Sequence, residues 1–119
     1  MSKKVLIVSY DPVFPAAIVE SFKDFQNINF LSAGNLSDGI AILESSDVTL
    51  LIVDYAIVLD KAISNFLSSQ SIGKIPIILI AQEKKFLDGF SGPNISKFSR
   101  DKLDSCTIPF VKKILASGS

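Results

Sequence analysis

Three short segments of the chain are almost wholly apolar and rich in β-branched residues, namely 5–8, 50–53 and 77–80. Strands that are buried on both faces of a parallel sheet have this composition. Two weaker strand candidates, 28–31 and 94–97, lie next to residues that favour turns. The apolar pattern therefore predicts five strands, three of them fully buried.

Between these segments, apolar residues recur every three or four positions, which is the spacing of an amphipathic helix. Alternating strands and helices favour βαβ units with right-handed crossovers and a mostly parallel sheet covered on both sides. The pattern predicts strands at 3–9, 28–32, 49–54, 75–80 and 94–97, and helices at 13–26, 36–46, 59–70, 83–90 and 100–116.

Glycine and proline shorten two of the predicted helices. Gly89, Gly92 and Pro93 limit the helix at 83–90. Pro109 interrupts the last helical segment unless it opens a new helix after Thr107, because proline lacks the backbone donor and clashes with the preceding turn.

The length of 119 residues and the 48% hydrophobic content favour one globular domain. We expect residues 1–119 to form it, with 117–119 as a frayed end or the start of a linker. The 12 basic and 12 acidic residues cancel, which argues against nucleic acid or a membrane surface as a partner. No segment is typical of a signal peptide or a bilayer span, so we expect a cytoplasmic protein.

The chain lacks several kinds of catalytic residue. Cys106 is the only cysteine and there is no histidine. An internal disulfide, a zinc site of the Cys/His kind, and Ser/His or Cys/His catalytic pairs are therefore excluded. We expect no enzymatic activity.

Ligands in open parallel α/β sheets bind outside the carboxyl ends of the strands. Asp54, a carboxylate at the end of an apolar strand, is the strongest candidate for a functional side chain there. A strand-end aspartate also commonly accepts backbone N–H bonds. For Asp11, followed by Pro12, we favour helix capping over ligation. The strand ends carry Ser9, Tyr10, Asp11, Asp54, Tyr55, Ala81, Gln82 and Lys97.

From Lys3 to about Leu115 the chain resembles the response-regulator receiver family, of the chemotaxis-regulator type. The resemblance is carried by VLIV at 5–8 with Asp11-Pro12, DVTLLIVD at 47–54 and IPIILIA at 75–81. It implies a flavodoxin-like (βα)5 doubly wound sheet with strand order 2-1-3-4-5. The fourth helix is expected to be shortened and the fifth interrupted.

In that family the residue that matches Asp54 accepts a phosphoryl group. Ser9 and Tyr10 stand where two acidic residues help to hold Mg²⁺, leaving Asp11 and Asp54 as weak metal candidates, so we expect little or no Mg²⁺ binding and no other cofactor. The strand-end hydroxyl is replaced by Ala81 and the aromatic switch residue by Asn94. We expect Asp54 to pair directly with Lys97, helped by the Ser9 or Tyr10 hydroxyl.

Three functions follow from these features. The favoured one is a pseudo-receiver, a signalling module that binds protein partners such as a histidine kinase or an output domain. A homodimer through the surface of 83–90, 94–97 and 100–116 also fits that family. The second is a working phosphoacceptor in a phosphorelay, with Asp54 assisted by Lys97 and Asp11. The third is a flavodoxin-like nucleotide or flavin binder, disfavoured because Asp11 and Pro12 suit phosphate poorly.

Overall fold

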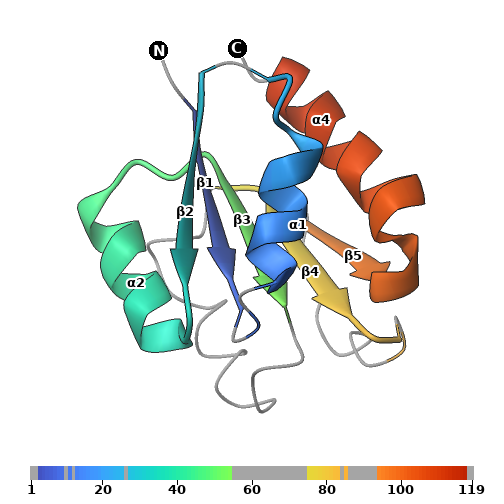
Figure 1. The fold of residues 1–119 in the computed structure, drawn as a ribbon. Helices are drawn as coiled ribbons and strands as arrows, with labels where there is room; N and C mark the ends of the chain where they lie inside the picture. The colour runs from blue at the N-terminus through green and yellow to red at the C-terminus, as the bar shows by residue number, and fades with distance from the viewer. Residues whose placement is uncertain are drawn as a thin grey trace.

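The structure, a computed structural model, describes residues 3–9, 11, 13–25, 27–54, 75–83, 85 and 94–117. A five-stranded, all-parallel sheet with strand order β2-β1-β3-β4-β5 forms its centre (Figure 1). The predicted α/β, flavodoxin-like fold and its strand order are confirmed. The strands are β1 (Lys3–Val8), β2 (Ile28–Ala33), β3 (Leu50–Asp54), β4 (Ile77–Ala81) and β5 (Ile95–Ser99).

The three strongest apolar segments form the middle of the sheet. β1 pairs with β3 from Val5 opposite Leu50 to Val8 opposite Val53. Every residue of β3 and β4 is buried. Strands that are covered on both faces can present polar groups only at their ends. Functional side chains of this sheet are therefore expected at the ends of the strands.

Helices cover both faces of the sheet (Figure 1). On one face, Leu43 of α2 (Leu36–Ser45) packs with Leu6, Leu51 and Leu79. On the other, side chains of α1 (Val13–Ser21) and α4 (Ile108–Ser117) join those of the central strands. The members of this second cluster are Val5, Ile7, Phe14, Ile18, Phe22, Leu50, Ile52, Ile78, Ile80, Ile108, Val111 and Leu115.

The first helix is shorter than its apolar stripe predicts. α1 ends at Ser21 rather than at residue 26, and a turn follows it. Phe22 and Phe25 still lie in the apolar cluster, where their ring centroids are 5.3 Å apart, and Asn27 adopts a positive φ of 66°. The Phe22 amide donates to the Val19 carbonyl and the Phe25 amide to the Phe22 carbonyl, so aromatic packing continues the stripe through turns after the helix has ended.

The helices predicted at 59–70 and 83–90 lie outside the described residues, apart from Glu83 and Lys85. The prediction for 100–116 is right about its interruption. A 3₁₀ turn (Arg100–Lys102) leads into a π-helix (Leu103–Thr107), and α4 then begins at Ile108. Within the described part of the chain, no helix is long and apolar enough to cross a membrane.

Pro109 explains the wide turn that precedes α4. In a regular helix its ring would clash with the carbonyl group four residues earlier, and it has no N–H to donate. The π-helix instead closes with the Ile108 N–H bonded to the Leu103 carbonyl, which places Pro109 in the first turn of a new helix. At the far end of α4, the Lys3 ammonium donates to the Leu115 carbonyl and ties this helix to β1.

The hydroxyl of Thr107 generates a stability prediction. Thr107 is 1% exposed, and among the described residues its Oγ1 has no hydrogen-bond partner. Replacing an unsatisfied hydroxyl by a methyl group removes a desolvation penalty. Thr107→Val should therefore leave the free energy of unfolding unchanged or raise it by up to about 1 kcal/mol in urea denaturation.

Thr49 provides the matched control, because its Oγ1 accepts a hydrogen bond from the Lys4 amide at 3.4 Å. Thr49→Val should lower stability by about 0.5–1.5 kcal/mol. A loss of that size in Thr107→Val would mean that the buried hydroxyl is bonded after all.

Candidate functional site

A buried carboxylate ends the central strand β3. Asp54 is 1% exposed, and its Oδ2 accepts a hydrogen bond of 3.0 Å from the hydroxyl of Ser9. Ser9 directly follows β1, the neighbour of β3, and its amide continues the ladder by donating to the Ala33 carbonyl at 2.9 Å. The carboxyl ends of adjacent parallel strands thus bring a hydroxyl and a carboxylate together.

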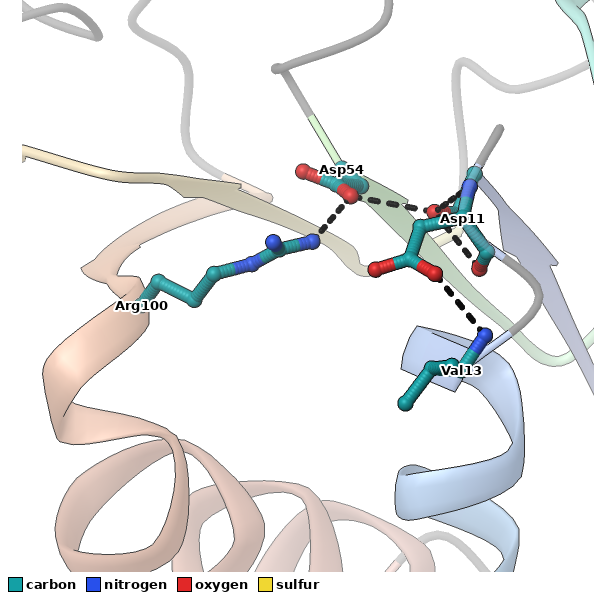
Figure 2. A network of polar contacts seen from close by, with 5 residues as sticks. Asp11, Val13, Asp54 and Arg100 are labelled. Carbon is teal, nitrogen blue, oxygen red and sulfur yellow. Dashed lines mark hydrogen bonds and ion pairs between the residues drawn. The ribbon is translucent and has the colours of Figure 1, made fainter.

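Arg100 supplies the positive charge of this site. Its guanidinium Nη2 donates to the same Asp54 Oδ2, forming an ion pair (Figure 2). The Arg100 side chain is 37% exposed, whereas that of Asp54 is 2% exposed. The guanidinium carbon also lies 4.8 Å from the centre of the Phe14 ring of α1. The cation is therefore held by β3 and by α1 at once.

Asp11 is used in the turn between β1 and α1. Its Oδ1 accepts the Val13 amide at 3.0 Å, and Figure 2 shows its carboxylate turned toward the start of α1. Its own amide donates to the Ser9 hydroxyl at 3.1 Å. The expected capping role of Asp11 is therefore confirmed, and Tyr10 and Pro12 lie outside the described residues.

Lys97 occupies a different place from the one expected. β5 continues to Ser99, opposite Ala81, so the predicted end at residue 97 is wrong by two residues. Lys97 lies opposite Leu79, in the middle of the strand. Side chains alternate along a strand, and Asp54, Ile80 and Phe98 form one row across the sheet, so Lys97 belongs to the other face. The expected pairing of Asp54 with a β5 lysine is replaced by the pair with Arg100.

Two further positions selected from the sequence lie apart from this network. Ala81 ends β4 and is 2% exposed, as part of the cluster beneath α2. Asn94 precedes β5 at the amino ends of the strands, away from Asp54. Its side-chain amide donates there to the Ile75 carbonyl at 2.6 Å. This bond joins the start of β5 to the start of β4, so Asn94 helps to align the strands rather than to line the site. Tyr55 lies outside the described residues.

The described residues around Asp54 do not fit a Mg²⁺ ion. In the described ranges no three His, Cys, Asp or Glu side chains lie close enough together to hold a metal. Ser9 contributes a neutral hydroxyl where a cation would need a second carboxylate, and the Asp54 oxygen that it contacts is already paired with Arg100. An Mg²⁺ ion prefers several oxygen ligands in octahedral geometry.

An open hollow of about 780 Å³ lies beside Arg100, past the carboxyl ends of β4 and β5. Its walls carry side chains of both signs. Glu83 pairs there with Lys85 at 3.1 Å, and both are more than half exposed. The lining residues are Gln82, Glu83, Lys85, Ser99, Arg100 and Asp101.

Sequence reasoning missed Arg100, although a signal was available. Arg100 is the only arginine of the chain, among eleven lysines. A planar guanidinium that keeps its charge suits a buried carboxylate better than lysine does. Its role stayed hidden because β5 was expected to end at residue 97, two residues before its actual end at Ser99.

A double-mutant cycle tests the ion pair. Arg100→Met leaves the buried carboxylate without its cation and should lower the free energy of unfolding by about 1–3 kcal/mol, less than for a fully buried pair because the arginine is partly exposed. Asp54→Asn with Arg100→Met should cost less than the sum of the single changes. Urea denaturation measures all four proteins.

Lys97→Met is the matched control, since it removes a cation from β5, which is separated from β3 by β4, on the other face of the sheet. It should change stability by less than about 0.5 kcal/mol and add independently to Asp54→Asn. Coupling of Asp54 to residue 97 and additivity with residue 100 would contradict the site described above.

Neither a family model nor a curated protein matches this sequence. Solved structures do match the fold. A response regulator receiver protein from Sinorhizobium medicae superposes with a TM-score of 0.77 at 10% identity, over 99% of this chain and 98% of that protein. The RcsB response regulator of Salmonella typhimurium matches at 0.73 and 17% identity over 99% of this chain, which spans 61% of that regulator.

A de novo designed Rossmann 2x3 protein also matches, with a TM-score of 0.70 and 14% identity over 99% of this chain and 92% of the design. At these identities the likeness concerns architecture alone. The predicted resemblance is borne out at that level: the chain has the fold of response-regulator receiver domains.

Proposed function

We propose that this chain is a receiver-like signalling module that acts by binding protein partners and does not use Mg²⁺-dependent aspartyl phosphorylation as its switch. The observation that carries the proposal is the Ser9–Asp54–Arg100 network. Arg100 neutralises Asp54 from within the chain, and Ser9 satisfies the same oxygen. A pocket closed in this way needs no external cation for stability.

The network also disfavours phosphoryl transfer. A transferring phosphoryl group carries negative charge that must be neutralised, and an attacking carboxylate oxygen must be accessible. Asp54 is 2% exposed at its side chain, and Oδ2 is bonded to two groups. With a hydroxyl in place of the neighbouring acid, the residues that could hold a metal beside it are too few.

The residues that would respond to phosphate are altered as well. Ala81 offers no hydroxyl at the end of β4, and Asn94 is bonded to the Ile75 carbonyl at the opposite edge. If Arg100 is taken as the strand-end cation, the position three residues earlier is Lys97, which is not aromatic. Whether the position is counted from Lys97 or from Arg100, the residue three places earlier is not the aromatic switch residue of the family.

One observation favours phosphoacceptor activity as the second candidate. Asp54 ends β3 beside an arginine, and arginine is a common ligand of phosphate groups. In that case Arg100 would remain next to the modified aspartate. The turn after β1 gives no similar support to a nucleotide binder, because the Asp11 and Val13 amides donate to Ser9 and Asp11 instead of pointing at a ligand.

For the partner surface we propose β5 and α4. Each residue of β5 is partly exposed, and Phe98 of this strand packs against Phe110 of α4 with ring centroids 5.3 Å apart. Partly buried aromatic side chains are typical of protein interfaces. A protein partner or a second copy of the chain would use the same surface.

Treatment with acetyl phosphate and Mg²⁺, followed by intact mass spectrometry, tests the proposal. We expect no phosphorylated species and no Mg²⁺-dependent shift of the amide resonances of Ser9, Asp54 or Arg100. The reason is that Arg100 and Ser9 already occupy the carboxylate.

Asp54→Asn is the matched variant, and a receiver domain with intact acidic residues shows that the reagents are active. Phosphorylation of the parent protein that disappears in Asp54→Asn would overturn the proposal and favour the phosphoacceptor.

A further inference from the structure

Arg100 stands between two environments of opposite kind. On its inner side lie the buried Asp54 carboxylate and the Phe14 ring. On its outer side lies the open hollow, whose lining residues include the acidic residues Glu83 and Asp101. A long, flexible side chain at such a boundary has a charged partner available in either direction.

We propose that Arg100 is a latch with two positions, one bonded to Asp54 and one turned into the hollow toward Glu83 and Asp101, and that the charge of Asp54 decides between them. This inference rests on the proposed function and names how the site is coupled to the partner surface. Loss of the Asp54 charge, or its capture by a basic side chain of a partner, releases the arginine.

Opposing energetic terms act on the two positions. Inside, the ion pair gains from the low dielectric around Asp54 but removes part of the guanidinium from water. In the outer position, the guanidinium regains hydration and lies near exposed acidic residues. Glu83 pairs there with Lys85, the two side chains being 55% and 69% exposed, and such exposed pairs contribute little to stability.

Movement of Arg100 would be transmitted to α4 because of its place in the chain. Arg100 opens the 3₁₀ turn that leads through the π-helix of Leu103–Thr107 into α4. A π-helix is a rare conformation that often marks functional sites, and the orphaned Thr107 hydroxyl adds a local penalty. This segment is therefore the part of the described chain best suited to rearrange, and it connects Asp54 with Phe110 on the partner surface.

The single arginine makes the latch directly observable. Only Arg100 contributes an Nε–Hε signal to ¹⁵N-resolved NMR spectra of the whole chain. In the parent protein this signal should be shifted from that of a free guanidinium and exchange slowly with water. In Asp54→Asn, which preserves shape without charge, it should move toward the free position and exchange about tenfold faster or more.

Amide resonances report the transmission. In Asp54→Asn, shifts should extend through residues 100–107 and into the first turn of α4. Arg100→Gln should produce the same shifts over 101–107, because either change opens the latch. Lys102→Gln, which removes an exposed cation from the same turn, should leave the Arg100 Nε–Hε signal in place.

The outer position has its own test. Adding Glu83→Gln and Asp101→Asn to Asp54→Asn should shift the Arg100 signal again, whereas the same two changes in the parent protein should not. An Arg100 signal that is unchanged in folded Asp54→Asn, or shifts confined to the immediate neighbours of Asp54, would overturn the latch. The phosphorylation test stands apart from this result, since an unmodified Asp54 with an immobile Arg100 would refute the latch alone.

Discussion

A carboxylate removed from water must be given a counter-charge and hydrogen-bond donors, and this requirement organises the functional end of the molecule. Asp54 reaches its buried position because β3 is covered on both faces up to its last residue. The chain meets the requirement internally, with the guanidinium of Arg100 and the hydroxyl of Ser9. Three segments far apart in the sequence are thereby joined at one oxygen atom.

The same contact connects the site to the rest of the fold. Arg100 follows directly on Ser99, the last residue of β5, and stacks on Phe14 of α1. The 3₁₀ turn that begins at Arg100 leads into the π-helix of Leu103–Thr107, so a rare backbone conformation lies close to the residue that carries the charge.

The comparisons separate architecture from chemistry. Receiver proteins and a designed Rossmann protein share this arrangement of strands at low sequence identity. The sheet brings strand ends together in all of them, and the side chains at those ends determine what happens there. Here they are a serine, an aspartate and an arginine, a set that favours a closed ion pair over a metal site.

The apolar pattern of the sequence was sufficient to predict the parallel sheet and the placement of Ser9, Asp54 and Ala81 at the carboxyl ends of its strands, because burial on both faces requires continuous apolar strands. The strand order followed from the resemblance to receiver domains. Capping by Asp11 could also be predicted from the sequence, because it involves only neighbouring residues. The partner of Asp54 was decided only by tertiary structure. β5 is polar and partly exposed, so its length depends on pairing with β4 through to Ser99, and those two extra residues turn Lys97 to the opposite face and deliver Arg100 to the carboxylate.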